Sequence, residues 1–349
     1  MRKIKLFKPY VSWYSVWNTI RVLRSGQLAE GPRVKEFEEK FAKKFNLTNV
    51  VAVNSGTTAL ELAYELAGIN SGDEVITTVF TCTATNIPLI RRGANIVFAD
   101  VDHDLNINVE DVKNKITDKT KAIVFVHFGG NNRGLKELLE IAKEKNITLV
   151  EDAAQAVASE FWGKADFTCM SLQAIKTLTT GDGGILVCKD NDLYKKAKRL
   201  RWFGYDREEK QRLGDIDLTE AGYKYHMNDL SAAIGLGNLK VFDKIAKHNK
   251  RLIKTYKDCG ITAYPWFALV FTDKRNELKT YLKEHGVESG MHHYRNDKYT
   301  LFGGRKTFPI MDELEDKYLI LPLHMGMNVS DVKRVCKLVN NFNEISKSN

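Results

Sequence analysis

A single lysine stands in a stretch that could do covalent chemistry. Lys176 is the only charged residue in the segment 171–180, SLQAIKTLTT, which runs into the glycine-rich turn GDGG at 181–184. A partly desolvated lysine has a lowered pKa, and its neutral amine can form a Schiff base with an aldehyde. Ser171 could donate to a phosphate, and glycines allow the backbone to lie close to a ligand. Because a lone lysine is usually a surface residue, this signal needs partners elsewhere in the chain.

An acidic pair lies 24 residues before that lysine. The apolar run ITLVED ends in Glu151 and Asp152. A carboxylate that pairs with a pyridine nitrogen keeps the nitrogen protonated and makes the ring an electron sink. Gln155, one helical turn further on, could hydrogen-bond an oxygen on such a ring. An acid at this position is also a common helix N-cap, so this signal is weak when it stands alone.

A third strand end could hold a phosphate. The short apolar run NVVAVN is followed by Ser55, Gly56, Thr57 and Thr58 at the start of a helical pattern. Free N–H groups at a helix N-terminus bind phosphate, and Gly56 would let the backbone approach it. An ordinary cap without a ligand explains the same residues.

The three strand ends together predict pyridoxal 5'-phosphate as the cofactor. They supply a phosphate cradle, a partner for the pyridine nitrogen and a lysine that can form an imine, and other cofactors do not need this set. A nicotinamide site would require GxGxxG after the first strand, which is absent there, and GxxxxGK[ST] is absent too. The pair Gly235 and Gly237 lies in a helical pattern.

The elements that must position these residues alternate along most of the chain. From about residue 33 to 240, short apolar runs alternate with helical patterns such as VKEFEEKFAKKF. This predicts an α/β fold, a mostly parallel central sheet between helices, with ligands beyond the carboxyl ends of the strands. We expect a large cofactor-binding domain over 1–240, including an N-terminal arm over 1–32 that packs elsewhere. A smaller α+β domain is expected over 241–349.

Composition indicates an ordinary globular protein. The 349 residues include 53 basic and 44 acidic ones, and the net charge is +9. The two signs are mixed along helical faces, so we expect no nucleic-acid partner, although a mild positive field suits a diphosphate-bearing substrate. No apolar run is long enough to span a membrane and no secretory signal is visible, so we expect a cytoplasmic protein with no membrane partner.

Cysteine and histidine usage points away from a metal centre. The five cysteines are odd in number, widely spread and without a CxxC pair, which is typical of reduced, mostly buried thiols. We therefore expect neither disulfides nor a metal site. His127, on a strand-like run, is interpreted as a core histidine with its hydrogen bonds satisfied.

With these motifs in hand, the chain resembles the DegT/DnrJ/EryC1/StrS aminotransferases along nearly its whole length. The resemblance is carried by NSGTTALELAYELAG, EDAAQA, IKTLTTGDGGILV and AGYKYHMNDLSAAIGLGNL. It implies a fold-type-I (aspartate aminotransferase-like) enzyme that moves an amino group, with L-glutamate as the expected donor, onto a nucleotide-linked keto-deoxysugar of the perosamine or viosamine type. By this resemblance Lys176 binds the cofactor and shuttles protons, Asp152 and Gln155 contact its ring, and its phosphate is held by Gly56, Thr57 and Ser171.

The resemblance also implies a homodimer with active sites at the subunit interface. In the family, the stretch that matches GYKYHMND reaches the cofactor of the partner subunit, which makes Lys224 and His226 cofactor-binding candidates. The family commonly has Asn at the position of Lys224 or sometimes at that of His226, so a cation replaces an amide here. A lysine at 176 argues against a related branch that has histidine there and performs dehydration.

Two further positions depart from the family pattern. Where an aromatic commonly stacks on the pyridine ring, this chain has Cys82. Cys82 could cover the ring, Phe80 could move in, or Cys82 could be a core residue. The stretch MHHYRNDKY makes His293 and Tyr294 candidates for contact with substrate.

Two alternatives to a nucleotide-sugar aminotransferase stay open on the sequence. The same fold could act on a cyclitol or another ketone, since substrate loops vary most. A non-enzymatic regulator that binds pyridoxal phosphate is the alternative from another class, although the enzyme fold leaves no segment for a DNA-binding module.

Overall fold

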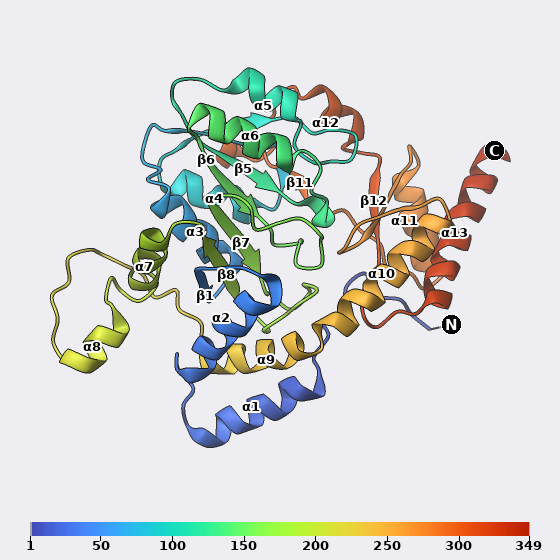
Figure 1. Cartoon of the computed structure of the whole chain (residues 1–349). Coiled ribbons are helices and arrows are strands. Elements are labelled where there is room, and N and C mark those ends of the chain that lie inside the picture. The colour runs from blue at the N-terminus through green and yellow to red at the C-terminus, as the bar shows by residue number, and fades with distance from the viewer. Residues whose placement is uncertain (1, 349) are drawn as a thin grey trace.

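A seven-stranded sheet forms the centre of the computed structural model, which describes residues 2–348 (Figure 1). Its order is β1-β8-β7-β6-β5-β2-β4, and the neighbours from β4 through β7 are parallel. Only β8 runs against its neighbours β1 and β7. The predicted α/β fold with a mostly parallel sheet is confirmed. The strands are β1 (Val50–Val53), β2 (Glu74–Thr78), β4 (Asn95–Ala99), β5 (Thr120–Val126), β6 (Thr148–Asp152), β7 (Phe167–Ser171) and β8 (Gly184–Cys188).

Helices cover both faces of this sheet, because the strands are apolar on both faces. Successive residues of a strand point to opposite faces. Val51 packs into one buried cluster with Leu62, and Ala52 packs into another with Phe37 and Phe41. The helices around the sheet are α2 (Pro32–Phe45), α3 (Gly56–Leu66), α4 (Thr83–Arg91), α5 (Val109–Lys115), α6 (Leu135–Lys145), α7 (Asn191–Leu200) and α9 (Asp229–Lys240).

A smaller antiparallel sheet follows in the C-terminal part of the chain. Its order is β12-β10-β9, with β9 (Thr262–Ala263), β10 (Ala268–Phe271) and β12 (Tyr318–Leu321). The change of sequence pattern near residue 240 falls at the junction between α9 and α10, where the chain enters this part. Its helices are α10 (Phe242–Asp258), α11 (Arg275–Glu284) and α13 (Val329–Ser348). The domain boundary itself stays a prediction.

One segment of the C-terminal part of the chain packs back against the part that contains the large sheet. The short strand β11 (Tyr294–Arg295) pairs with β3 (Phe80–Thr81), directly before Cys82. The helix α12 (Pro309–Leu314) follows, and the carboxylate of Asp100 accepts hydrogen bonds from its first turn. Short 3-10 turns lie at Phe128–Gly130 and Thr300–Phe302. This returning segment brings the residues around 291–297 next to the ends of the parallel strands.

The N-terminal arm divides between the two parts of the molecule. Ile4 pairs with Val287 and its backbone N–H donates to the carbonyl oxygen of Gly286 over 2.8 Å, so the first residues pack with the C-terminal part. The helix α1 (Trp13–Ser25) lies along α9 at the outer edge of the molecule (Figure 1). The short helix α8 (Arg207–Leu213) extends from the other side.

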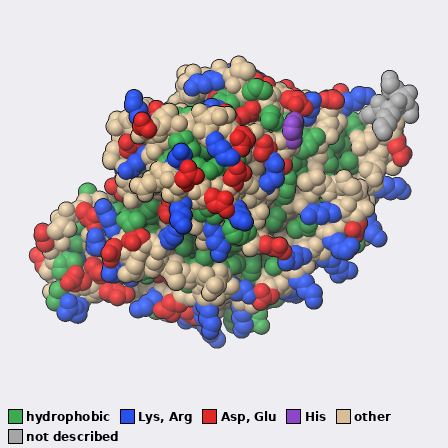
Figure 2. All heavy atoms as spheres, turned by 45° about the horizontal axis from the view of Figure 1, so that its top comes forward, with side chains coloured by type: hydrophobic (Ala, Val, Ile, Leu, Met, Phe, Trp, Pro, Cys, Tyr) green, Lys and Arg blue, Asp and Glu red, His purple; other side chains and the backbone are tan. Residues whose placement is uncertain are grey.

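Charges of both signs are mixed on the surface, and the cysteines form no disulfides among residues 2–348. Figure 2 shows lysine, arginine and acidic side chains interspersed over the face that it displays. All five cysteines are free, and three of them, Cys169, Cys188 and Cys336, are buried. Among the residues from 2 to 348, no helix is long and apolar enough to cross a membrane.

Candidate active site

The predicted residues meet in one cavity of about 460 Å³ at the carboxyl ends of β6 and β7. Parallel strands end at one edge of a sheet, and the N-terminus of α3 faces the same edge. Residues from four distant stretches therefore share the lining of one cavity. Of the candidates, the cavity is lined by Gly56, Thr57, Cys82, Asp152, Gln155, Ser171, Lys176 and His293.

Asp152 presents a buried carboxylate to this cavity. Its Oδ2 accepts a hydrogen bond from Thr85 Oγ1 over 2.7 Å, and its Oδ1 accepts one from the backbone N–H of Ala154 over 3.1 Å. The hydroxyls of Thr81 and Thr85 are 2.9 Å apart. Since Thr85 gives its only proton to the carboxylate, Thr81 must donate to Thr85. These bonds fix the direction of the carboxylate beside the cavity.

The adjacent acid, Glu151, points to the other face of the sheet. It accepts backbone N–H groups of Lys164 and Ala165 over 2.6 and 2.7 Å, and His127 Nε2 lies 2.8 Å from its Oε2. Burial by itself would raise the pKa of Glu151, but the hydrogen bonds from His127 and the backbone hold it below its usual value. His127 lies in the core as predicted, but the prediction that its hydrogen bonds are satisfied holds only for Nε2, since Nδ1 has no hydrogen-bond partner among residues 2–348.

Lys176 meets the requirement for an amine that attacks an aldehyde. Burial lowers its pKa to about 8, against the opposing effect of Asp152 and Cys82. Its Nζ lies 3.8 Å from the centroid of the Trp266 ring, and the Trp266 indole N–H donates to the carbonyl oxygen of Ile175 over 3.2 Å. About a tenth of the amine is therefore neutral at pH 7, far more than for a lysine with an ordinary pKa.

The start of α3 has the form of a phosphate cradle. Ser55 caps the helix and forms a reciprocal pair of hydrogen bonds with Thr58. The N–H groups of Gly56 and Thr57 come first in the helix, where an α-helix offers them no internal partner. A Cβ at Gly56 would lie 2.8 Å from the Cβ of Ser171, so only glycine allows these two strand ends to approach. Thr58, predicted to bind the cofactor, uses its side chain in the cap and does not line the cavity.

Gln155 and His293 form a hydrogen-bonded pair at the cavity. Gln155 Oε1 accepts the backbone N–H of Gly129 over 2.6 Å, which fixes the orientation of the amide. Its Nε2 then faces His293 Nε2 at 3.1 Å, so the amide donates and the imidazole carries its proton on Nδ1. Burial, with Lys176 and His292 nearby, lowers the pKa of His293 to about 3. His293 is thus neutral, and the second N–H of Gln155 is available to a ligand oxygen.

The structure shows which of two residues, Cys82 or Phe80, lies at the cavity where a stacking aromatic was expected. Cys82 lines the cavity, and burial raises the pKa of its thiol, which is therefore uncharged at neutral pH. Phe80 is buried away from the cavity, with its ring centroid 5.2 Å from that of Phe128 and 5.1 Å from that of Tyr318. The alternative in which Phe80 moves into the site is wrong for this structure.

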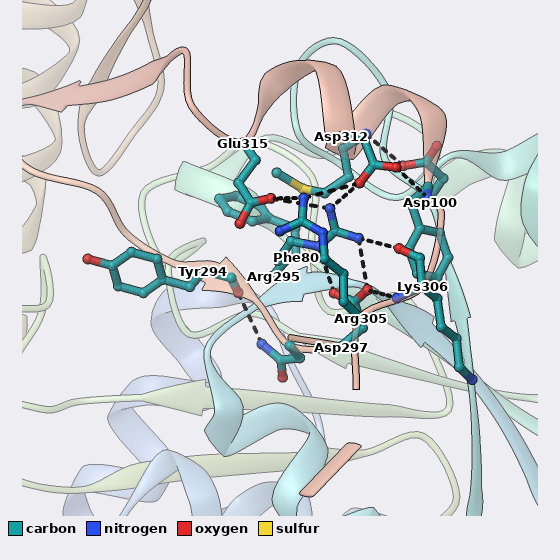
Figure 3. Close-up of polar contacts among 12 residues, drawn as sticks. Phe80, Asp100, Tyr294, Arg295, Asp297, Arg305, Lys306, Asp312 and Glu315 are labelled. Carbon is teal, nitrogen blue, oxygen red and sulfur yellow. Dashed lines mark hydrogen bonds and ion pairs between the residues drawn. The ribbon is translucent and has the colours of Figure 1, made fainter. Parts of the chain in front are cut away.

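Besides Thr58, three candidates do not line the cavity. Lys224 is exposed, and its carbonyl oxygen accepts from the amide of Asn54 over 3.2 Å. His226 pairs with Val53, and burial together with nearby cations lowers its pKa to about 4. Tyr294 is exposed and points away from the neighbouring charge cluster (Figure 3). Their roles stay predictions.

A buried arginine holds the segment that carries His293. Arg295 forms a two-pronged ion pair with Asp297, at 2.7 and 2.8 Å, and also pairs with Asp312 (Figure 3). Next to it, Asn296 donates to the carbonyl oxygen of Thr81 over 2.7 Å. These contacts fix β11 against β3 and thereby place His293 at the cavity.

We expect Arg295→Met to destabilise the protein by about 3–5 kcal/mol, because it leaves the fully buried Asp297 without its cation. Urea unfolding followed by circular dichroism measures this. Arg305→Met is the matched control, since Arg305 belongs to the same cluster but is exposed, and its loss is expected to cost about 0–1 kcal/mol. Equal losses in both variants would contradict the assignment.

Sequence reasoning missed several residues of the site. Trp266, His292 and Thr85 were not singled out, although the first two line the cavity and the third bonds Asp152. Trp266 lies in no motif with a chemical spacing, so no local signal marks it, whereas His292 stands in the stretch MHHYRNDKY directly before His293 and could have been named with it. Thr85 lies three residues after Cys82, and only its position on the first turn of α4 could have suggested a contact.

The site fits pyridoxal phosphate. The close approach of Gly56 to Ser171 provides the cradle, Asp152 provides the fixed carboxylate, and Lys176 provides an amine with a lowered pKa. Gln155 has a donor to spare for an oxygen on the ring.

Residues 16–340 match the family model described as DegT/DnrJ/EryC1/StrS aminotransferase family. The chain is 32% identical to the spore coat polysaccharide biosynthesis protein SpsC of Bacillus subtilis, over 95% of both chains. It is 31% identical to the UDP-4-amino-4-deoxy-L-arabinose--oxoglutarate aminotransferase of Shewanella sediminis, over 95% of this chain and 96% of that protein. The crystal structure of AtS13 from Actinomadura melliaura superposes with a TM-score of 0.89 at 30% identity, covering 98% of this chain and 99% of that one.

Proposed function

Because this chain belongs to the DegT/DnrJ/EryC1/StrS aminotransferase family, we propose that it transfers an amino group from L-glutamate to the keto carbon of a nucleotide-linked keto-deoxysugar. Aminotransferases of this family depend on pyridoxal phosphate. The observation that carries the proposal is that Lys176 and Asp152 line one cavity with the cradle at Gly56 and Ser171.

Each residue has a definite task in this proposal. The cofactor, when bound, supplies an electron sink that stabilises negative charge on the carbon bearing the amine. Asp152 would pair with the ring nitrogen, and Gln155 would donate to the ring oxygen. Gly56, Thr57 and Ser171 would bind the phosphate. Lys176 would hold the cofactor covalently, and its amine, when free, would accept and return the proton of the reacting carbon.

The substrate assignment is supported by the relatives and by charge. The name of the Shewanella relative joins a UDP-linked amino sugar with oxoglutarate, the keto acid that glutamate becomes when it gives up its amine. The net charge of +9 favours approach of a diphosphate-bearing substrate. Five free cysteines fit a reducing compartment, and we include a cytoplasmic location in the proposal.

Visible absorbance of the purified protein tests the proposal. A yellow band that bleaches on addition of L-glutamate, and returns when a nucleotide-linked keto sugar is added, is the expected result. Because 2-oxoglutarate restores the band by reversing the glutamate reaction, it is left out of the test; return of the band with another simple keto acid, and with no nucleotide-linked keto sugar, would contradict the sugar substrate. A yellow protein that does not respond to glutamate would contradict amino transfer.

The proposal includes a homodimer whose subunits complete each other's sites. Lys224 and His226 lie outside the cavity of their own subunit, as residues that serve a partner would. The outer face of α1 exposes large apolar side chains, of which Trp13 is 79% and Trp17 is 62% exposed. Exposed apolar surface of this kind is typical of an interface.

We expect Trp13→Ser combined with Trp17→Ser to dissociate the dimer, since truncating a buried interface tryptophan typically costs about 2 kcal/mol or more. Size-exclusion chromatography with light scattering measures the mass, and activity is expected to fall with it. Phe271→Ser is the control, because Phe271 is also exposed but lies on β10. A wild-type mass and activity in the double variant would exclude α1 from the interface.

A further inference from the structure

The indole of Trp266 lines the active-site cavity but has no task in the proposed function. It lies between β9 and β10, is only 3% exposed, and reaches the cavity from the C-terminal part of the chain. Its backbone N–H donates to the carbonyl oxygen of Gly129 over 3.0 Å, next to the turn that bonds Gln155. Trp266 is therefore anchored to the same strand ends that carry the other site residues.

Two contacts connect this ring with Lys176. The indole N–H donates to the carbonyl oxygen of Ile175 over 3.2 Å, directly before the lysine. The lysine Nζ lies 3.8 Å from the ring centroid. The hydrogen bond fixes the ring relative to the backbone of the lysine, and the ring in turn gives the amine a defined resting position.

Packing from the N-terminal arm fixes the plane of the ring. Phe7 stacks on Trp266 with centroids 4.9 Å apart and an interplanar angle of 18°. Phe7 also stacks on His292, at 5.3 Å and 5°. The indole is thus part of a column of three rings and cannot rotate without disrupting its neighbours.

An aromatic ring is a better neighbour for the Lys176 amine than a carboxylate would be. A cation over an indole face is attracted by the ring quadrupole, and the attraction grows when water is excluded. A carboxylate at the same place would raise the pKa of the lysine and suppress its attack on an aldehyde. The indole stabilises the ammonium moderately and leaves the neutral amine accessible.

We propose that Trp266 is a positioning residue that holds the Lys176 ammonium over its ring whenever that amine is not bonded to the cofactor. This inference rests on the proposed role of Lys176. It gives the freed lysine a fixed place at the cavity, from which it would deliver its proton, and so links the N-terminal arm to proton transfer.

The pKa of Lys176 in the full-length protein without cofactor tests the inference. Trace acetylation with acetic anhydride across a pH series, read by mass spectrometry of the peptide that contains Lys176, reports the midpoint of its titration. We expect Trp266→Leu to lower this midpoint by about one pH unit, because the ammonium loses its aromatic partner. Trp266→Phe keeps an aromatic face and loses the indole N–H, so a decrease of about half a unit is expected.

Phe267→Leu is the matched control, since Phe267 is the buried neighbour of Trp266 and packs on Phe128 at 5.0 Å. It is expected to leave the midpoint unchanged. An unchanged midpoint in Trp266→Leu, or equal decreases in Trp266→Leu and Phe267→Leu, would overturn the inference. If Trp266→Leu does not fold, Trp266→Phe decides alone: a midpoint equal to wild type overturns the inference.

Failure of this inference can be told apart from failure of the proposed function. The labelling is done without cofactor, so it measures the contact between Lys176 and Trp266 whether or not the protein transfers amines. The absorbance response to L-glutamate separately decides the amino transfer.

Discussion

Lys176→Ala is expected to reduce kcat at least about ten-thousandfold, because it removes both the amine that binds the cofactor and the group that moves the proton. No other residue that lines the cavity can replace the lysine. The remaining nitrogen bases there are His292 and His293, whose pKa values are lowered and which cannot form a covalent link of this kind. The absorbance band of the bound cofactor is expected to shift or disappear. Steady-state amino transfer and the visible spectrum measure both effects.

Lys189→Ala serves as the control for Lys176→Ala. Lys189 follows β8 and its side chain is 71% exposed, so its loss removes a lysine without touching the cavity. Its spectrum and kcat are expected to equal those of the wild type. A primary amine added to Lys176→Ala is expected to restore part of the proton transfer. A Lys176→Ala protein that keeps the wild-type band and bleaches with glutamate would show that another lysine binds the cofactor.

Asp152→Asn is expected to reduce kcat by about a thousandfold while the cofactor stays bound, because one preorganised charge is lost from the site. The asparagine has nearly the same shape and can still accept the hydrogen bond from Thr85 or Ala154. It has no negative charge to hold a proton on the ring nitrogen, so negative charge on the reacting carbon is less well stabilised. Single-turnover kinetics with L-glutamate isolate this step from substrate binding.

Glu151→Gln is the matched control for Asp152→Asn. Both acids end β6, but Glu151 is bonded to His127 and to the backbone at 163–165 on the other face of the sheet. We expect Glu151→Gln to lower the melting temperature and to leave the half-reaction of the folded protein unchanged. If Glu151→Gln slows the half-reaction as much as Asp152→Asn, the assignment of Asp152 to the ring nitrogen is wrong.

The main residues of the site could be predicted because each belongs to a local pattern. Asp152 ends a continuous apolar strand, Gly56 begins a helix after another strand, and Lys176 precedes a glycine turn. Local patterns of this kind depend on residues that are neighbours in sequence. The rule that parallel strands end at one edge of the sheet then brings these residues together without any knowledge of their contacts.

Other features required the tertiary structure. Trp266 and His293 come from a part of the chain more than 80 residues beyond Lys176. The placement of His293 depends on β11 pairing with β3 and on the buried Arg295 cluster, and that of Trp266 on its bonds to Gly129 and Ile175. Whether Cys82 or Phe80 faces the cavity depends on how Phe80 packs between Phe128 and Tyr318. The use of Thr58 in a helix cap, rather than at the cavity, depends on the direction of one hydroxyl.

The sequence by itself determined the fold class and the family, and it singled out Lys176 and Asp152 as candidates, because periodicity and strand-end motifs are encoded within a few residues. The tertiary structure alone decided which side chains surround them. Long-range packing and burial set the tautomer of His293, the lowered pKa of Lys176 and the ring above which its amine lies. Those properties arise from contacts between distant segments, and no short stretch of sequence contains them.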